Sequence, residues 1–317
     1  MRYVVRADAS QPNGSGHVMR SSAIAEELIA RGKSVVFIGR ISGLPWVEER
    51  IAKLGFSDIY SNPQNFISNA NSDVLILDSY EMAVDNEFIK LEKWLHVVTI
   101  VDDLTPSYSS TLRIHPGLDP NWDKEPSTSI LAGPKYIPFR SSLSNYIAAS
   151  SESSELLKIV VVAGGSDPHN LGLEISKVLA KFSELFQVYF FTNFSSAFAS
   201  DSRFHFCEIG QLLDEVSRDA NLILTTSSTS SLEFIARGFS VGVACAVENQ
   251  KQYYDAFAQL GIAAQIGFRT SSGWNLEPNT IHKLITEPGF RADLAKKAYG
   301  LIDFKGVSRI VDAIMSL

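Results

Sequence analysis

A glycine-containing loop near the amino terminus carries the residues best suited to chemistry. It runs from Asp8 to His17 and includes Gly14 and Gly16, which allow a ligand to approach the backbone ahead of helix amides that can bind an anion. The positive end of a helix disfavours an imidazolium, so His17 is predicted to be neutral and able to accept a proton. The alternative is that His17 only caps the helix or packs at its start.

The same loop argues against two common nucleotide ligands. It does not spell the Gly-x-Gly-x-x-Gly fingerprint of dinucleotide-binding folds, and it has no P-loop lysine. NAD and ATP are therefore disfavoured, and no cofactor is predicted.

A stretch rich in serine and threonine, from Thr225 to Ala236, is the second candidate site. Hydroxyls and amides at Thr229 and Ser230 could hold a diphosphate, while the carboxylate of Glu233 accepts hydrogen bonds from ribose hydroxyls. The alternative is a capping box from Ser230 to Glu233, in which the glutamate only folds back on its own helix.

Two further loops follow predicted strands in the second half of the chain. The first contains Gly165 and Ser166, and it either approaches a phosphate or makes a tight turn. The second contains Asn249 and Gln250 at the start of a helix, where they reach a ligand or where Asn249 is an ordinary helix cap.

Acidic residues end two predicted strands of the first half. Asp78 is followed by Ser79 and Tyr80, and Asp102 is followed by Asp103. Loop residues at strand ends carry function in many folds, but acidic ones are often only solvated, so both interpretations stay open.

These loops must be positioned by a regular alternation of strands and helices. Apolar runs alternate with stretches of helical spacing, which predicts a parallel sheet. In the first half, strands are predicted at 3–5, 34–38, 74–77 and 97–101, and helices at 18–29, 45–54 and 84–94.

The alternation restarts after a Ser-, Ala- and Glu-rich stretch at 146–155, which is predicted to be a linker. We therefore predict an amino-terminal domain at 1–150 and a carboxy-terminal nucleotide-binding domain at 151–317. In the second domain the predicted elements are strands at 158–163, 187–191, 222–225 and 241–244, a helix at 172–182 and an amphipathic terminal helix at 306–317.

Each half opens with a strand, a glycine loop and a helix. The predicted fold class is therefore α/β, with two Rossmann-like doubly wound domains that face each other across a cleft. In such sheets ligands bind beyond the carboxyl ends of the strands, which is where all the loops described above lie.

Composition sets further limits. The 317 residues are about twice the usual domain length, and 45% hydrophobic with 20% charged residues is typical of a soluble globular protein. The formal net charge is -7 and no basic cluster stands out, which argues against a nucleic-acid partner.

Two further features bear on location. Cys207 and Cys245 have no metal-ligand spacing and are predicted to be reduced and buried, as in a cytoplasmic protein. No run of about 18 apolar residues occurs, so no integral membrane segment is predicted, while peripheral attachment stays open.

Together these segments resemble the family of UDP-sugar hydrolases exemplified by UDP-2,4-diacetamido-2,4,6-trideoxy-β-L-altropyranose hydrolase, which acts in pseudaminic acid biosynthesis. The likeness spans nearly the whole chain, and its most specific part is Arg6-Ala7-Asp8-Ala9-Ser10 followed by Gly14-Ser15-Gly16-His17-Val18-Met19-Arg20. The other matching motifs are Asp78-Ser79-Tyr80, Asp102-Asp103-Leu104, Gly133-Pro134-Lys135-Tyr136 with Arg140, Gly164-Gly165-Ser166-Asp167-Pro168 with Asn170, and Glu248-Asn249-Gln250.

The resemblance implies a GT-B-type fold, related to the glycosyltransferase that adds N-acetylglucosamine to lipid II precursors, with UDP held mainly by the second domain. It implies that the enzyme releases UDP by inverting attack of water at the anomeric carbon, without a metal. Uridine specificity rests on the resemblance alone, and other enzymes of the same biosynthesis are open as partners. The resemblance implies His17 as the base, Tyr80 and Asn249 at the sugar, Glu233 at the ribose, and Asp8, Arg20, Arg140 and Gln250 as substrate-binding residues.

Two rival functions remain at this stage. A GT-B glycosyltransferase would use the same donor site, with His17 deprotonating an acceptor hydroxyl instead of water. A noncatalytic nucleotide-sugar-binding protein would bind UDP tightly whether or not His17 is present.

Overall fold

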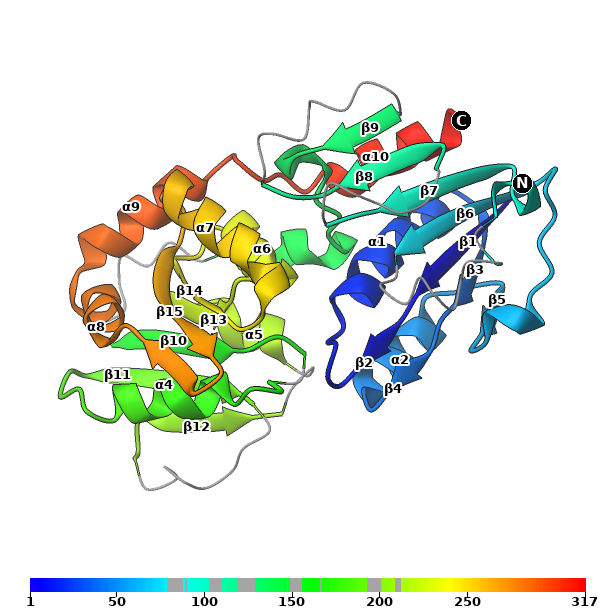
Figure 1. Ribbon diagram of the computed structural model, residues 1–317. Coiled ribbons are helices and arrows are strands. Elements are labelled where there is room, and N and C mark those ends of the chain that lie inside the picture. Colours follow the sequence, from blue (N-terminus) through cyan, green and yellow to red (C-terminus); the bar gives the residue numbers. More distant parts are fainter. Residues whose placement is uncertain are drawn as a thin grey trace. The chain divides into compact units, whose positions relative to one another are not determined.

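The computed structural model describes residues 1–78, 88, 90–102, 110–118, 129–146, 148, 156–165, 167–192, 201–208 and 212–317. The chain divides into two compact units, of which unit 1 comprises Met1–Ser141 with Asp303–Leu317 and unit 2 comprises Ser142–Ile302. Each unit contains one seven-stranded sheet (Figure 1). The predicted linker at 146–155 lies almost wholly outside the described residues.

The sheet of unit 1 is parallel throughout, with the strand order β5-β3-β1-β6-β7-β8-β9. A small second sheet pairs β2 (Ala9–Ser10) with β4 (Ile41–Ser42). The other strands are β1 (Arg2–Ala7), β3 (Ser34–Ile38), β5 (Asp58–Tyr60), β6 (Asp73–Asp78), β7 (His96–Ile100), β8 (Leu112–His115) and β9 (Ser129–Ala132). The helices are α1 (Gly16–Ala30), α2 (Pro45–Lys53) and α10 (Gly306–Met315), with 3-10 turns η1 (Pro63–Asn65), η2 (Leu91–Lys93) and η4 (Pro134–Tyr136).

Both faces of this sheet are covered by apolar side chains. On one face Val5 and Ile76 pack with Ile24 and Leu28 of α1, and on the other face Val4 packs with a separate cluster. Because both faces are buried, the central strands β1, β3, β6 and β7 are mainly apolar runs, which is why these four could be predicted from sequence.

Two of the helices that flank the sheet in unit 1, α1 and α10, have clear sequence causes. Helix α1 ends where Gly32 adopts a left-handed backbone with φ +73°, a conformation that favours glycine. Helix α10 buries Val307, Ile310, Val311 and Ile314, so the predicted terminal helix is confirmed. This helix belongs to unit 1, whereas the sequence-based boundary placed 306–317 in the second domain.

The sheet of unit 2 has the order β12-β11-β10-β13-β14-β15-β16, parallel except for the β15–β16 hairpin. Its strands are β10 (Leu157–Val162), β11 (Phe186–Phe191), β12 (Phe204–Cys207), β13 (Leu222–Thr226), β14 (Val241–Cys245), β15 (Ala264–Thr270) and β16 (Gly273–Leu276). Its helices are α4 (Leu171–Leu179), α5 (Leu213–Ser217), α6 (Thr229–Ala236), α7 (Lys251–Leu260), α8 (Pro278–Thr286) and α9 (Pro288–Ala298), with 3-10 turns η5 (Ser141–Tyr146), which begins at the last residue of unit 1, and η6 (Glu248–Gln250).

The predicted α/β class with two doubly wound sheets is confirmed. In each sheet the chain order reverses beside the first strand, since β1 lies between β3 and β6, and β10 lies between β11 and β13. Ligands of open α/β sheets bind outside the carboxyl ends of the strands at such a reversal. The topology therefore directs attention to the loops after β1 and β6 in unit 1, and after β10 and β13 in unit 2.

Some predictions differ from the structure. The predicted helix at 84–94 falls mainly outside the described residues, and its described end is the 3-10 turn η2. Strands β8, β9 and β12 were not predicted because each has only four residues, and β9 and β12 are half-buried for most of their length.

The two cysteines were both predicted to be reduced and buried. Both cysteines are free thiols, but Cys207 is only half-buried, so the prediction that it is buried was wrong. Edge strand β12 holds it at the margin of the sheet, where fewer neighbours cover it.

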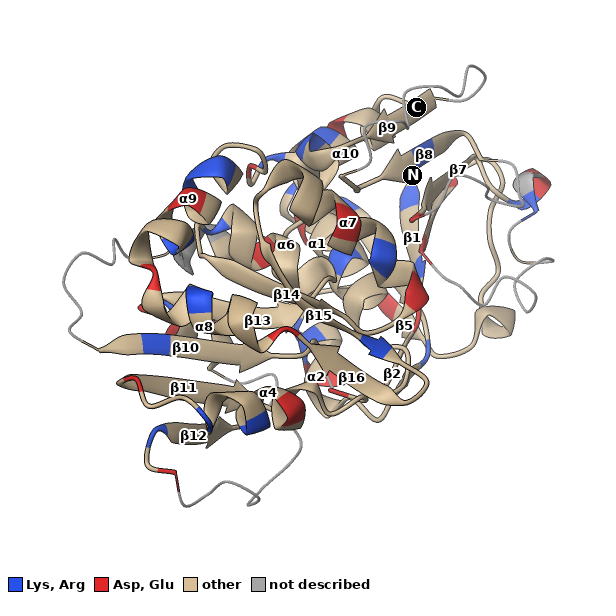
Figure 2. Cartoon of the chain, turned by 60° about the vertical axis from the view of Figure 1, so that its left-hand side comes forward, with Lys and Arg blue, Asp and Glu red and all other residues tan. Residues whose placement is uncertain are grey.

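Acidic and basic residues are interspersed over the elements in Figure 2. Within the described ranges, no helix has the length and apolarity to cross a membrane, and no three His, Cys, Asp or Glu residues cluster as metal ligands.

The start of α10 provides a test of this packing. A Cβ on Gly306 would lie 2.1 Å from the backbone oxygen of Ile137, which cannot move without shifting the chain. We expect Gly306→Ala to lower the free energy of unfolding by about 1 to 3 kcal/mol, as overpacking does, measured by urea denaturation.

Gly289 in the first turn of α9 is the matched control. A Cβ there meets nothing within 4 Å, so Gly289→Ala should leave stability unchanged or raise it by up to about 1 kcal/mol. Equal effects of the two substitutions would contradict this account of α10.

Candidate functional site

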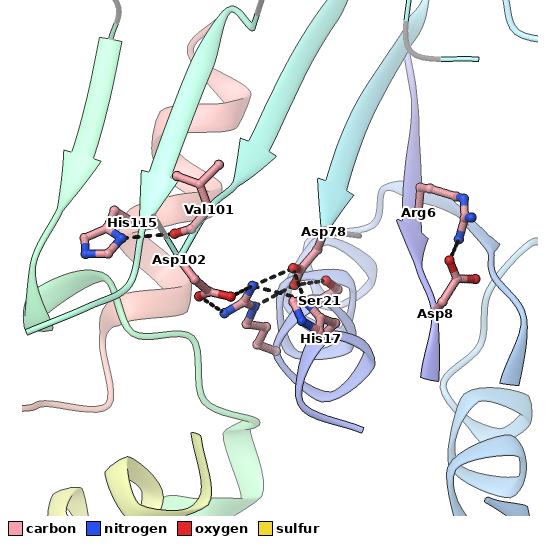
Figure 3. A network of polar contacts seen from close by, with 9 residues as sticks. Arg6, Asp8, His17, Ser21, Asp78, Val101, Asp102 and His115 are labelled. Carbon is pink, nitrogen blue, oxygen red and sulfur yellow. Dashed lines mark hydrogen bonds and ion pairs between the residues drawn. The ribbon is translucent and has the colours of Figure 1, made fainter. Parts of the chain in front are cut away.

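The centre of the site in unit 1 is Asp78, the last residue of β6. It is fully buried and lies beside Ala7 of β1, at the reversal of the strand order. Its carboxylate accepts hydrogen bonds from Arg20 Nε (2.7 Å), Arg20 Nη2 (2.6 Å) and Ser21 Oγ (2.8 Å), and it lies 2.5 Å from His17 Nδ1 (Figure 3).

Helix α1 supplies all three partners of this carboxylate. His17, Arg20 and Ser21 are spaced i, i+3 and i+4 in its first two turns, so they project from one face of the helix. The preceding loop is short and closed, because Gly14 and Ser10 exchange backbone hydrogen bonds at 2.7 and 3.3 Å. The helix start is therefore fixed directly beside the end of β6.

The contact with Asp78 determines the tautomer of His17. An ionised carboxylate only accepts hydrogen bonds, so Nδ1 carries the hydrogen and donates it to Oδ1 of Asp78. In the neutral ring the lone pair then resides on Nε2, which becomes the proton-accepting atom. Arg20 Nη2 lies 3.1 Å from the same Nδ1, but two donors cannot bond each other, so the carboxylate is the partner.

Arg20 is held between two carboxylates. Besides Asp78, it donates to Asp102 from Nη1 (2.5 Å) and Nη2 (3.0 Å), and only 6% of the residue is exposed. Burial alone would lower the pKa of Arg20, but the charges of Asp102 and Asp78 outweigh it and raise that pKa well above its ordinary value. Arg20 was predicted to bind substrate, whereas its guanidinium is engaged within the protein.

The same balance keeps Asp78 ionised. Burial raises the pKa of a carboxyl group, but the charge of Arg20, the contact with His17 and the hydrogen bonds from both residues outweigh burial, so the pKa of Asp78 lies below its ordinary value. A carboxylate next to a histidine orients the ring and stabilises the imidazolium that forms when Nε2 takes a proton. An imidazole held in this way can accept a proton at Nε2.

The glycine loop leaves open space beside Gly14. Gly14 has φ +79° with open space at its Cβ position, and Gly16 is the first residue of α1. The N-cap residue, Ser15, makes no side-chain capping hydrogen bond.

The other predicted residues of unit 1, Asp8 and Arg140, are positioned by different elements. Asp8 forms an ion pair with Arg6 at 2.6 Å and accepts a hydrogen bond from the backbone N–H of Arg40 at 2.7 Å, so it ties together the loops after β1 and β3 (Figure 3). Arg140 is half-buried in the segment between η4 and η5.

The Ser/Thr-rich turn of unit 2 divides into an inner and an outer part. Thr225, Thr226 and Ser227 are buried, and Ser227 Oγ donates to the backbone oxygen of Gln250 at 3.2 Å. Thr229 and Ser230 are half-buried at the start of α6, whose N-cap residue makes no side-chain capping hydrogen bond. Only the outer hydroxyls are therefore placed as the diphosphate hypothesis requires.

Glu233 lies on the same face of α6 as these hydroxyls. The helix begins at Thr229, so Glu233 is one turn further on, at i+4 from Thr229 and i+3 from Ser230. A capping box needs the glutamate at the third helical position, which is Ser231 here. The capping-box alternative for Glu233 therefore does not apply.

The glycine loop after β10 ends in an internal cap. Asp167 accepts hydrogen bonds from the backbone N–H groups of Leu171 (2.8 Å) and Gly172 (3.1 Å), and from Thr192 Oγ1 (2.8 Å). Its buried carboxylate occupies the amino terminus of α4, where a phosphate would otherwise bind. For the loop with Gly165 this favours the alternative of a tight turn.

The two predicted residues of the loop after β14 lie in different surroundings. Gln250 uses its side-chain oxygen to accept a hydrogen bond from the backbone N–H of Ala246 at 3.0 Å, which closes the loop, while Asn249 is exposed in η6. Asn249 is not the N-cap residue, because η6 begins at Glu248 after Val247. Tyr80 and Ser166 lie outside the described residues.

Apart from their place in the matching motifs, Asp78 and Asp102 were interpreted from sequence only as acidic strand ends. The signal that could have identified Asp78 is a carboxylate closing an otherwise apolar strand in a doubly wound domain. Its partners His17 and Arg20 are 61 and 58 residues away in the chain, so the pairing itself could not be predicted.

Comparison with known proteins shows the fold. No protein-family model matches the sequence. An uncharacterized protein of Methanocaldococcus jannaschii is 22% identical over 284 residues, which cover 81% of this chain and 58% of that protein. The chain thus spans less than two thirds of the length of this curated relative.

Several solved structures are similar over the full length. MurG of Acinetobacter baumannii superposes with a TM-score of 0.69 at 13% identity, covering 100% of both chains. The glycosyltransferase SnogD from Streptomyces nogalater gives 0.61 at 11% identity (100% and 99% covered), and a putative UDP-N-acetylglucosamine 2-epimerase from Listeria monocytogenes gives 0.59 at 11% identity (99% and 96%). The chain therefore has a GT-B-like fold.

The depressed pKa of Asp78 predicts how stability depends on pH. A carboxyl group whose pKa is lower in the folded state stabilises the fold above its unfolded value, and that contribution is lost as the pH falls through the folded value. We expect Asp78→Asn to lower the free energy of unfolding by about 3 to 5 kcal/mol at neutral pH, because it breaks a buried ion pair. The difference in free energy of unfolding between this variant and the wild type should narrow as the pH is lowered below 3.8, the ordinary pKa of an aspartate. Urea denaturation at a series of pH values measures it.

Asp255→Asn serves as the control. Asp255 pairs with Lys251 on the exposed side of α7, and such pairs contribute less than about 1 kcal/mol. A difference for Asp78→Asn that stays constant down to pH 2 would contradict the ionised state of Asp78.

Proposed function

We propose that the protein is a nucleotide-sugar-processing enzyme, and more specifically a hydrolase that releases UDP from a UDP-linked diacetamido-trideoxy sugar. The GT-B-like fold supports the wider class, because similar structures include one named as a UDP-N-acetylglucosamine 2-epimerase. The motif resemblance around His17 supports the hydrolase. The observation that carries the proposal is the Asp78–His17 pair, which leaves Nε2 as the basic atom.

In the proposed reaction His17 Nε2 removes a proton from water as the water oxygen attacks the anomeric carbon. The bond between that carbon and the diphosphate oxygen breaks, and UDP leaves with the electron pair, which inverts the configuration. Asp78 stabilises the imidazolium that forms, and the proton then passes to solvent. General-base catalysis of this kind contributes about 10² to 10⁴ in rate.

The nucleotide is assigned to unit 2. The amides and hydroxyls of Thr229 and Ser230 would stabilise the negative charge of the leaving diphosphate, and Glu233 would accept hydrogen bonds from the ribose. Asn249 and Tyr80 at the sugar, and Asp8 and Arg140 as substrate contacts, rest on the family resemblance.

Glycosyl transfer is the second candidate function. A similar structure is named as a glycosyltransferase, and the same base would serve an acceptor hydroxyl in place of water. Hydrolysis differs in needing no acceptor, so an assay without one separates the two functions.

The test is to incubate the protein with UDP-sugars, including UDP-linked diacetamido-trideoxy sugars, without an acceptor and to follow phosphorus NMR signals. We expect UDP to be released, and we expect His17→Ala to abolish the release while leaving UDP affinity nearly intact, because the base does not hold the nucleotide. The loss should be about 10² to 10⁴ in kcat.

The other outcomes are equally informative. Turnover only when an acceptor is added would support glycosyl transfer, and conversion of one UDP-sugar into another without UDP release would support epimerisation. UDP binding without any turnover would indicate a noncatalytic binding protein. Full activity of His17→Ala would remove the catalytic role of His17.

The ribose contact predicted for Glu233 can be measured separately. Glu233→Ala should weaken UDP binding by about 1 to 3 kcal/mol in calorimetry, because the ribose hydroxyls lose a charged acceptor. Glu174→Ala is the matched control, since Glu174 lies in the first turn of α4, whose terminal amides already bind Asp167. Equal UDP affinities for both variants and the wild type would exclude the ribose contact.

A further inference from the structure

Asp102 lies beyond the Asp78–His17 pair and is linked to it through Arg20. It follows β7, and 20% of its side chain is exposed. Arg20 Nη1 donates to Oδ1 of Asp102 at 2.5 Å, and Arg20 Nη2 is shared between Asp102 at 3.0 Å and Asp78 at 2.6 Å. One guanidinium therefore bridges two carboxylates in a fork-like geometry.

The cluster consists of the side chains of His17, Arg20, Asp78 and Asp102. Its charges do not balance while His17 is neutral. Asp78 and Asp102 contribute two negative charges and Arg20 one positive charge, so the cluster carries one net negative charge. When Nε2 of His17 accepts a proton, the cluster becomes neutral. In a largely buried site this favours uptake of the proton, since charge interactions are weakly screened there.

We propose that Asp102, acting through Arg20, is a positioning residue that strengthens His17 as a base. The inference rests on the proposed role of His17. With Asp102 neutralised, Arg20 would balance Asp78 alone, and protonation of His17 would then create a net positive charge. The second carboxylate thus leaves the negative charge of Asp78 available to the imidazole.

In the described part of the chain, several charged groups around α1 have partners other than His17. Arg31 pairs with Asp312 of α10 at the far end of α1, which is 14 residues or about 21 Å from His17 at 1.5 Å per residue. Asp73 pairs with Arg2 at the opposite end of β6, and Arg6 of β1 pairs with Asp8. Glu26 of α1 lies 4.0 Å from Arg50 of α2, two to three turns beyond His17.

The experiment measures the ring of His17 directly. The protein has six histidines, so histidine-selective ¹⁵N labelling gives few signals, and His17→Gln identifies the one from His17. We expect the titration midpoint of His17 in Asp102→Asn to fall by about half a pH unit or more relative to the wild type, because a charge relayed through Arg20 acts over a longer distance than a direct contact. Asp102→Glu, which keeps the charge, should restore most of the midpoint.

Asp312→Asn is the matched control. It makes the same substitution opposite an arginine of the same helix, at the end remote from His17, and should leave the midpoint unchanged. Circular dichroism checks that each variant is folded, and Asp102→Ser, which also removes the charge, replaces Asp102→Asn if that variant is unstable. Identical titrations of the wild type and the folded charge-removing variant, or equal shifts in that variant and in Asp312→Asn, would overturn the proposal.

This readout does not depend on the proposed reaction. If no UDP-sugar is hydrolysed, the titration still decides whether Asp102 acts on His17. If hydrolysis is found, the acid limb of kcat/KM for Asp102→Asn should move to lower pH together with the midpoint, since the neutral ring is the active form. A limb that moves without the midpoint would overturn the link between Asp102 and His17.

Discussion

The site in unit 1 depends on one buried carboxylate. An ionised Asp78 could not be removed from water without compensation, and the compensation comes from Arg20, Ser21 and His17 on a single helix. Each of these partners is then held in place by the same carboxylate. The orientation of His17, the commitment of Arg20 and the position of the helix start are therefore parts of one electrostatic arrangement and cannot be changed separately.

The two sheets both reverse their chain order beside the first strand, but the carboxylates near the two reversals have different partners. At the reversal in unit 1, the last residue of β6 points to the first turns of α1 and forms the histidine pair. At the reversal in unit 2, the carboxylate of Asp167 instead caps the helix of its own loop. This occupies two amides at the start of α4. The N-cap residue of α6 makes no side-chain capping hydrogen bond, and the proposed diphosphate site is assigned to that helix start, with Thr229 and Ser230.

How far sequence could predict these features depends on the range of the interactions involved. Strands such as β3 and β6 are buried on both faces, so their apolar runs identify them locally, whereas the short edge strand β12 has too little burial to leave a pattern. His17 could be predicted as a candidate because a glycine loop before a helix is a local signal. The ion pairs of Arg20 with Asp78 and Asp102, 58 and 82 residues away, could not be predicted from local sequence.

The depressed pKa of Asp78 also decides where a proton taken up by His17 resides. If Asp78 were readily protonated, the imidazole could pass its Nδ1 proton to the carboxylate, and the charge that stabilises the imidazolium would vanish. The positive charge of Arg20 opposes that transfer, since it lowers the pKa of Asp78 despite burial. The proton therefore stays on the ring, and the ring can return it to solvent. In the proposed mechanism Arg20 thus acts on His17 through Asp78, and Asp102 shares the positive charge of Arg20 with Asp78.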